Sequence, residues 1–446
     1  MVRNITQIRN PMDRLPSDCL VSILQWLSPK EMGKILTTCK IFCRIIMETY
    51  WNKFQIKLKL APHILYVSKH FHFMCFEYEW TEFADEYLQL VAGTTQFRLI
   101  KNNTITSAGI RMLTNLTELI LGSDIHKSID DQCLRELTKL TSLDLTRRIV
   151  SGDTLCHLTS HRLRRLTIKD CWELNDAQLI GLTGLRFLFL DNCPNVTMRS
   201  LTTLTSLREL LIGGNPNVTN EIFHTFSHLT RLRFGGMDQI TDDGLKYASG
   251  LVELGLNGCR SFTDQGLIYL THLKDLSMES CSQVTDIGFQ MLGNVHEIYI
   301  SHNHNITDDS VRYLTSVHKL SLNNCSKITD QSVKLLGNLK YLALENNTCI
   351  TNECLPYLTN LQTLVLSHCE NITDKGVAFL TTVSVLALNG CTSITDDSVR
   401  LLTKATSLDL RGCCHVSSEC VTKLRQVVEQ VLYDNPRVST DMEKVD

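Results

Sequence analysis

The sequence predicts an α/β solenoid in which short parallel strands line a concave face and short helices form the convex face. Three observations predict this fold. An apolar residue recurs at a strict 22-residue step from Leu163 to Val427. A pair of leucines, two residues apart, follows at the same place in most rows, and the triplet I-T-D recurs further along. Because one row cannot bury its own apolar residues, stacked rows must share a continuous core.

The 22-residue step defines about sixteen rows within residues 94–440. Leu140 and Leu116 continue the series upstream with slightly longer steps, and Thr94 opens a weaker first row. A typical row, residues 251–272, is LVELGLNGCRSFTDQGLIYLTH. Positions 1 to 22 are counted from its first leucine. The leucines at positions 4 and 6 alternate with period two, which predicts one buried face of a short strand.

Position 9 and the I-T-D triplet close each predicted strand and open each predicted helix. Position 9 needs a small side chain that hydrogen-bonds the turning backbone. It is Cys in eight rows and Asn in five: Cys171, Cys193, Cys259, Cys281, Cys325, Cys369, Cys391 and Cys413, then Asn102, Asn215, Asn303, Asn347 and Asn435. In the triplet we expect Ile to be buried, Thr to cap the helix, and Asp to favour its first turn.

These rows resemble leucine-rich repeats. Cys at position 9 together with I-T-D resembles the cysteine-containing subclass common in F-box proteins, although 22 residues is shorter than that subclass usually shows. The resemblance implies a binding surface and, by itself, no particular activity.

A separate helical module is predicted at residues 15–51. One face of its first helix is apolar, a Ser28-Pro29 step restarts the chain, and two more apolar helices follow. Three helices in fewer than 40 residues cannot bury so much apolar surface among themselves. Part of that surface should therefore contact another protein.

The segment resembles the F-box, through L-P at its start, C-K near its end and a closing Trp51. Met32 and Phe42 replace a leucine and a tryptophan of the usual pattern. The resemblance implies docking on a Skp-family adaptor, and through it on a cullin-RING ubiquitin ligase. The implied adaptor-binding residues are Leu15, Pro16, Leu20, Ile23, Leu24, Leu27, Pro29, Met32, Cys39 and Phe42. The alternative is a bare helical cap on the solenoid, but a cap requires neither L-P, nor C-K, nor the spaced tryptophan.

The remaining segments are a tail at 1–14, an aromatic-rich connector at 52–93 that we expect to pack against the first repeats, and a tail at 441–446. The net charge of -3 disfavours a nucleic-acid partner. Without a signal peptide or an apolar run long enough to cross a bilayer, we expect a cytoplasmic or nuclear protein with no membrane partner. The eighteen cysteines are then reduced, and the repeat explains most of the eight N-x-T sequons.

A partner-binding surface is predicted on the concave face, where the strand positions between the leucines lie. Its candidate residues are Arg147, Arg165, Lys169, Phe189, Arg231, Arg233 and Tyr299. Guanidinium groups pair bidentately with carboxylates and phosphates, so this stripe suits an acidic or phosphorylated protein segment. The alternative is a solvated strand face whose arginines pair with neighbouring carboxylates. RNA fits less well, because the aromatic residues are few.

Two other groups of residues do not predict a site. His296, His302, His304 and His318 lie close in sequence, but their side chains alternate in direction, so no metal ligand set is expected. The position-9 cysteines are expected to be a ladder of structural thiols rather than disulfides. No catalytic constellation or cofactor motif occurs. The sequence therefore predicts a non-enzymatic substrate-recognition subunit of a ubiquitin ligase, the alternative being a non-catalytic scaffold or inhibitor.

Overall fold

The computed structural model describes residues 73–76, 84–89, 92–99, 104–122, 129, 131–146, 155, 158, 162–314 and 316–434. All of them belong to one of two compact units of the chain, Ser68–Asp446. The predicted F-box residues, from Leu15 to Phe42, and the candidate Arg147 lie outside the described residues. The fold below is therefore that of the repeat array.

Strands in the described residues form one parallel sheet, in which each strand pairs with the next along the chain. They are β1 (Phe73–Phe76), β2 (Gln96–Leu99), β3 (Glu118–Leu121), β4 (Ser142–Thr146), β5 (Arg165–Lys169), β6 (Phe187–Asp191), β7 (Glu209–Gly213), β8 (Arg231–Gly235), β9 (Glu253–Asn257), β10 (Asp275–Ser277), β11 (Glu297–Tyr299), β12 (Lys319–Ser321), β13 (Tyr341–Ala343), β14 (Thr363–Val365), β15 (Val385–Ala387), β16 (Ser407–Asp409) and β17 (Gln430–Leu432).

Single-turn helices follow most strands. They are α5 (Asp85–Leu88), α6 (Ser107–Arg111), η5 (Asp131–Glu136), α8 (Asp176–Leu179), α9 (Met198–Leu201), α10 (Glu221–Thr225), α11 (Asp242–Leu245), α12 (Asp264–Leu267), α13 (Asp286–Phe289), α14 (Asp308–Val311), α15 (Asp330–Val333), η6 (Asn352–Tyr357), α16 (Asp374–Val377), α17 (Asp396–Val399) and α18 (Ser418–Leu424). Most are four residues long, because a 22-residue row leaves little chain between its strand and the next.

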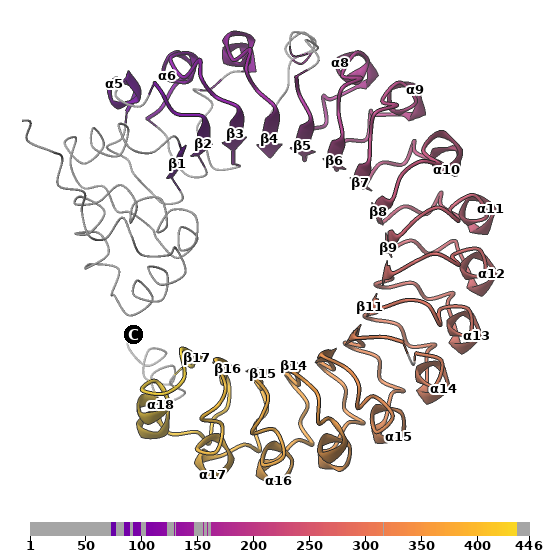
Figure 1. Cartoon of the computed structure of the whole chain (residues 1–446), viewed down its shortest axis with the longest axis vertical. Coiled ribbons are helices and arrows are strands. Elements are labelled where there is room, and N and C mark those ends of the chain that lie inside the picture. The colour runs from indigo at the N-terminus through magenta and orange to yellow at the C-terminus, as the bar shows by residue number, and fades with distance from the viewer. Residues whose placement is uncertain are drawn as a thin grey trace, which may run out of the picture. The chain divides into compact units, whose positions relative to one another are not determined.

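The array curves into an arc with strands on its inner side and helices on its outer side (Figure 1). Strands β2 to β17 correspond to the sixteen predicted rows, so the predicted solenoid is confirmed. The sheet also begins one strand before the first predicted row. β1 lies within the segment predicted as a connector and pairs in parallel with β2, placing Phe73 opposite Gln96.

The apolar positions form one core between the strands and helices. In the row that begins at Leu251, that leucine is 4% exposed, Leu254 1%, and Leu256 and Phe262 0%. The same positions are buried in row after row. Burying a side chain of this size stabilises a fold by about 1.5–3 kcal/mol. The repetition of these small terms along the array is what makes a quasi-linear fold stable.

The first connection between rows joins a threonine to the aspartate of the preceding row. The carboxylate of Asp286 accepts hydrogen bonds from the backbone N–H and the hydroxyl of Thr307, both at 2.7 Å. Thr307 Oγ1 in turn accepts from the N–H of Asp309 and caps α14. The sequence predicted the cap; the bridge between rows was not predicted.

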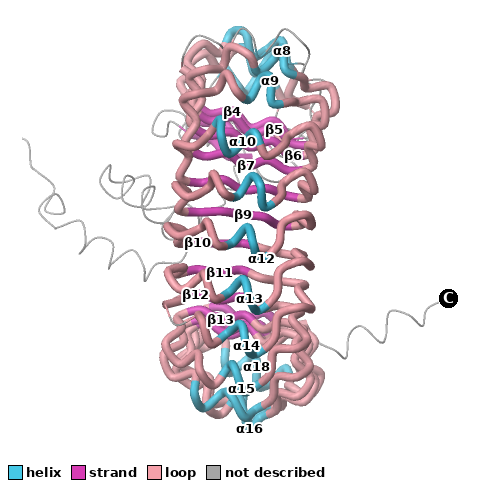
Figure 2. The backbone as a smooth tube through the Cα atoms, turned by 90° about the vertical axis from the view of Figure 1, so that its right-hand side faces the viewer, coloured by secondary structure: helices cyan, strands magenta, loops and turns pink. Residues whose placement is uncertain are grey.

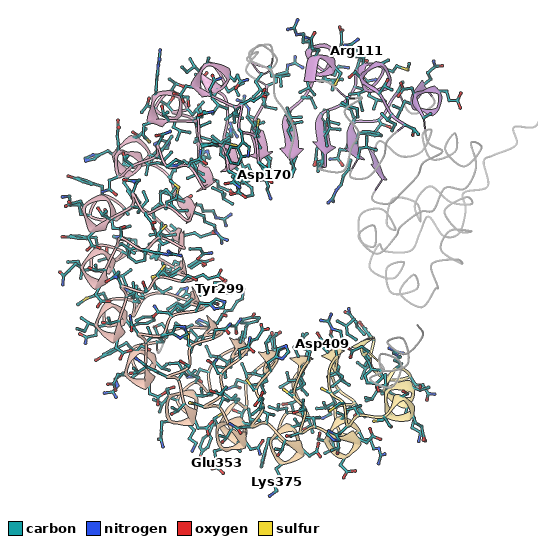
Figure 3. The ribbon with its side chains drawn as sticks, turned by 180° about the vertical axis from the view of Figure 1, so that it is seen from behind. Arg111, Asp170, Tyr299, Glu353, Lys375 and Asp409 are labelled. Atoms are coloured by element: carbon teal, nitrogen blue, oxygen red, sulfur yellow. The ribbon has the colours of Figure 1, made fainter. Side chains whose placement is uncertain are left out.

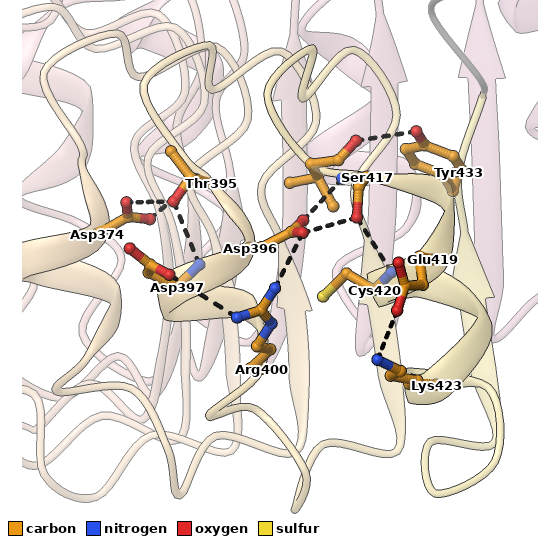
Figure 4. A network of polar contacts seen from close by, with 11 residues as sticks. Asp374, Thr395, Asp396, Asp397, Arg400, Ser417, Glu419, Cys420, Lys423 and Tyr433 are labelled. Atoms are coloured by element: carbon orange, nitrogen blue, oxygen red, sulfur yellow. Dashed lines mark hydrogen bonds and ion pairs between the residues drawn. The ribbon is translucent and has the colours of Figure 1, made fainter.

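Figure 4 shows the same arrangement at the end of the array, where Asp374 holds Thr395 and Asp396 holds Ser417. Burial alone would raise the pKa of Asp374, but hydrogen bonds from Ser398 and Thr395 outweigh it and lower that pKa below its usual value. The bridge therefore favours the ionised carboxylate.

Two rows replace this aspartate with asparagine. Asn220 donates to the hydroxyl of Thr241 at 2.7 Å and accepts from its N–H at 3.0 Å. The hydroxyl of Thr241 then makes no capping bond to its own helix, and Thr373, held by Asn352, makes none either. Asparagine thus keeps the bridge and loses the cap.

The second connection runs through position 9. The Sγ of Cys281 donates to the carbonyl oxygen of Leu256 at 3.0 Å, and Cys391 does the same to Leu366 at 3.0 Å. Where Asn replaces Cys, its amide also donates to a backbone carbonyl oxygen of the preceding row, although Asn215 and Asn303 use the carbonyls of Cys193 and Cys281 instead. Asn347, fully buried, donates to the carbonyl oxygen of Leu322 at 2.8 Å. The predicted equivalence of Cys and Asn is confirmed.

Position 8 has a left-handed backbone, which sequence analysis did not single out. Its φ is 56° at Asn192, 54° at His302 and 71° at Gly412. Gly, Asn and Asp tolerate this conformation best, and several rows carry one of them here. That pattern of residues was the available signal for the turn that ends each strand.

Candidate functional site

The concave face is built from strand positions 3, 5 and 7, whose side chains point away from the core. Figure 3 shows Tyr299 and Asp409 on the inner side of the arc and Glu353 and Lys375 on the outer side. Parallel pairing places equivalent positions next to one another on successive strands, so residues 22 apart become neighbours. The face therefore carries columns of side chains whose chemistry changes from row to row.

Strands β5 and β6 place two cations over two aromatic rings. The guanidinium of Arg165 lies 3.9 Å from the ring centroid of Phe187, and the Nζ of Lys169 lies 4.4 Å from that of Phe189. Among the described residues neither cation forms an ion pair with a carboxylate. A cation held over a ring keeps its charge and some of its hydrogen-bonding groups available to an anion. Together these four residues form the β5–β6 platform.

The arginines of β8 have carboxylate partners. Arg231 lies 2.9 Å from Glu253 through Nε and 3.6 Å from Glu209 through Nη1. Arg233 donates from its Nε to Glu253 at 2.6 Å. Glu253 is only 14% exposed at its side chain, so it holds both guanidinium groups from beneath. Arg231 and Arg233 thus follow the alternative prediction, in which arginines of a solvated strand face pair with neighbouring carboxylates.

An acidic track continues on the next strands. Register places Asp275 between Glu253 and Glu297 on neighbouring strands. Burial raises the pKa of Asp275, and the charges of Glu253 and Glu297 raise it further. At the far side Lys319 forms an ion pair with Glu297 at 2.7 Å.

Tyr299 borders this track. Its hydroxyl donates to Glu297 at 3.2 Å, and burial together with that neighbouring carboxylate raises its pKa to about 12. Its ring lies 6.5 Å from that of Tyr341 on β13. Beyond β13 the two central concave positions are uncharged through β15: Thr363, Val365, Val385 and Ala387.

The predicted concave residues thus separate into three groups. Arg165, Lys169 and Phe189 share the β5–β6 platform, Arg231 and Arg233 belong to an ion-paired cluster three strands away, and Tyr299 lies three strands further. At about 4.8 Å per strand, each step of three strands spans roughly 14 Å. Sequence analysis missed Glu209. The alternation of Glu209, Arg231 and Glu253 at one position of successive rows was the signal for that cluster.

Other reactive side chains in the array have structural surroundings. The rings of His296 and His318 lie edge to face, 5.6 Å apart. Among the described residues, no group of three His, Cys, Asp or Glu residues is arranged to hold a metal ion. The described position-9 cysteines are buried free thiols, and burial raises the pKa of Cys281 to about 12. No helix of the described part of the chain is long and apolar enough to span a membrane.

Comparison with known protein families matches two segments of the chain. A family model described as F-box-like matches residues 12–57, and a model described as Leucine Rich repeat matches residues 357–380. No curated protein is similar enough in sequence to count as a match.

Among solved structures, the chain is similar to TLR13 in its complex with ssRNA13, with 18% identity and a TM-score of 0.51 over 78% of this chain and 60% of that one. That similarity shows the fold alone. Two further solved structures are similar with lower TM-scores, and no property of this chain is inferred from them. They are a chain of the yeast Rad7–Elc1 complex (14% identity, 97% of this chain and 100% of that one, TM-score 0.46) and an internalin, InlF, of Listeria monocytogenes (20%, 86% and 97%, 0.37).

The described fold and the repeat match make the array a leucine-rich-repeat solenoid. An F-box-like segment precedes that array in the sequence, so the chain combines the two modules of F-box/leucine-rich-repeat proteins.

Proposed function

We propose that the chain is the substrate-recognition subunit of an SCF-type cullin-RING ubiquitin ligase. Residues 15–51 bind a Skp-family adaptor, and the concave face binds a protein substrate. The observation that supports this most is the pairing of an F-box-like segment with an array whose inner face changes its chemistry from row to row. Ubiquitin transfer is the work of the recruited ligase, and this chain contributes proximity.

The β5–β6 platform is the part of the concave face best suited to an acidic or phosphorylated segment. Its cations have no described carboxylate partner, whereas the guanidinium groups of Arg231 and Arg233 are already occupied by Glu253 and Glu209. An anion at β8 must displace an existing ion pair. At β5–β6 no described ion pair has to be broken. Asp144 on the neighbouring β4 is partly buried, which raises its pKa, although the charge of Lys169 acts to lower it. We therefore place the first contact of the substrate at Arg165 and Lys169, with cytoplasm or nucleus as the compartment.

Co-purification with a Skp-family adaptor tests the proposal. The full chain is expected to retain the adaptor, and a variant with Leu15, Pro16 and Ile23 replaced by alanine is expected to lose it. An array-only mechanism predicts that both bind equally, or that neither binds. The matched control is Leu335→Ala, which removes an exposed apolar side chain from the array and leaves adaptor binding unchanged.

A further inference from the structure

From residue 180 onward, one flank of the array carries no carboxylate. This flank is the side on which each row returns from its helix to the next strand, and it comprises positions 18–22 with positions 1 and 2 of the following row. From residues 180–186 to residues 422–428, at every 22-residue step, these segments contain neither Asp nor Glu. The chain as a whole has more acidic than basic residues, 47 against 44. The acidic residues are therefore concentrated elsewhere, and the flank has a positive potential.

Position 2 supplies a basic ladder along this flank. Its first section is Arg164, Arg186 and Arg208, and its second is Lys274, His296, His318 and Lys340. The rows are in direct register, because the backbone N–H of His296 donates to the carbonyl oxygen of Lys274 at 2.8 Å, and that of Lys340 donates to His318 at 2.8 Å. Neighbouring side chains of the ladder are therefore about one strand spacing apart.

The ladder differs from the ion-paired part of the concave face in having no counter-charge. Among the described residues, Arg186, Arg208, Lys274 and Lys340 form no ion pair with a carboxylate, whereas Arg231 and Lys319 on the concave face do. Arg164, Arg186 and Arg208 place like charges on successive rows, where they repel one another. An anionic partner over this flank would relieve that repulsion.

Beside the ladder runs a column of apolar side chains at position 19. Eight successive rows contribute to it, and all except the half-buried Tyr313 are exposed: Tyr247, Tyr269, Met291, Tyr313, Leu335, Tyr357, Phe379 and Leu401. Leu335 is 67% exposed and Phe379 58%. Contiguous exposed apolar surface of this kind marks an interaction site.

The flank is also close to flat. Figure 2 shows the array from its outer side, and the loops on each side of the helices line up along its length. The apolar column and the basic ladder coincide in four successive rows, from Tyr269 and Lys274 to Leu335 and Lys340. This stretch includes Met and Leu side chains, which do not stack on bases. A specific protein interface depends on a few unequal anchors in pockets, which this regular surface does not offer. A planar, laterally uniform, anionic partner with an apolar layer is the surface of a lipid bilayer.

We propose that this flank binds peripherally to an anionic membrane. Its lysines and arginines contact the headgroups, and the position-19 column enters the interfacial layer. A peripheral contact needs no spanning segment, so it revises the expectation of no membrane partner that rested on the lack of one. Because the strands run from one flank to the other, the concave face stays open to a substrate. The inference does not depend on the F-box.

Sedimentation of the full chain with vesicles tests this inference. Vesicles of phosphatidylcholine with phosphatidylserine are compared with vesicles of phosphatidylcholine alone. We expect binding to the anionic vesicles only. K274E/K340E is expected to lower the partition coefficient by roughly 30-fold or more, since each basic residue near such a surface contributes about fivefold. M291S/L335S is expected to lower it as well, with no change in net charge.

The matched control is R260E/K327E, which makes the same change in charge on the opposite flank, at positions 10 and 11, where both side chains are exposed. It is expected to bind almost as the wild type does. The inference is overturned if the wild type does not bind anionic vesicles, or if the control loses as much binding as K274E/K340E. Binding to polyuridylate RNA without binding to vesicles would also overturn it and assign the flank to nucleic acid. Adaptor co-purification of the same variants reports separately on the proposed function.

Discussion

The connections between rows and the concave face are built from the same repeats, yet they behave in opposite ways. Between rows, a threonine meets an aspartate or asparagine, and a position-9 Cys or Asn meets a carbonyl oxygen, with few changes along the array. On the concave face, an arginine over a phenylalanine gives way to an ion-paired cluster and then to an uncharged surface. The repeated contacts hold the fold, and the unrepeated ones are available for recognition.

The largest effect expected from this comparison is at a buried inter-row amide. Asn347 donates to the carbonyl oxygen of Leu322 and accepts from the N–H of Cys325, both at 2.8 Å. Asn347→Ala leaves two buried backbone groups without partners and should lower the free energy of unfolding by about 3 kcal/mol. Asn347→Cys restores the donor, as Cys369 provides it to Leu344, and should cost less than half as much. Urea denaturation measures both. Equal losses of unfolding free energy in the two variants would mean that the hydrogen bonds of the Asn347 amide do not contribute to stability.

A smaller effect is expected at the threonine bridge. Asp286→Ala removes both bonds to Thr307 and should cost about 2 kcal/mol. Asp286→Asn should cost only about 1 kcal/mol, because asparagine keeps the bridge and loses the helix cap, as Asn220 does at Thr241. The same denaturation experiment ranks the two variants. An asparagine variant as unstable as the alanine variant would show that the carboxylate charge, rather than the bridge, is what matters.

Acidification should weaken the array through the same bridges. Burial raises the pKa values of Asp176 and Asp396, but hydrogen bonds from Ser200, Thr197 and Ser417 outweigh it and lower both below 3.8. A carboxyl whose pKa is lower in the folded state stabilises the fold above its unfolded-state pKa and loses that contribution as pH falls through the folded value. We expect the Tm to fall below about pH 4.

The double variant D176N/D396N should show a shallower decline of Tm in that range. An identical decline in the variant would place the acid sensitivity elsewhere in the chain.

The smallest effect on stability is expected at the β5–β6 platform. R165E/K169E removes two cation–ring contacts, each worth about 0.5–1 kcal/mol at exposed sites, and should leave the Tm nearly unchanged. The matched control is R199E/K375E, which reverses two exposed charges away from the concave face. Loss of folding in R165E/K169E would show that the platform is part of the scaffold and would weaken its assignment to recognition.

The sequence predicted the solenoid well because the determinants of the fold repeat. The buried leucines, the threonine caps and the Cys–Asn equivalence each occur often enough to stand out against the variable positions. The partners across rows were harder to predict. From the sequence, Asp286 is only a favourable charge in the first turn of its own helix. Its contact with Thr307 could not be predicted, because the two residues are 21 apart in the chain and meet only when the rows stack.

The candidate site was predicted only in part for the same reason. The positive charges in the sequence pointed equally to Arg165 and Arg231. In the structure, Arg165 lies over an aromatic ring, whereas Arg231 forms ion pairs with two carboxylates. Those partners lie one row away on either side, at the same strand position. Comparing successive rows column by column would have found them; following each row by itself did not.

Proximity labelling tests the central claim most directly. The full chain, a variant lacking residues 1–51, and R165E/K169E would each carry a labelling enzyme, with and without proteasome inhibition. We predict at least one protein that the full chain labels and that accumulates when the proteasome is inhibited. The variant lacking residues 1–51 should still label this protein but should no longer promote its degradation. R165E/K169E should fail to label it. A labelled set that is the same for all three forms, with no member sensitive to proteasome inhibition, would contradict the account.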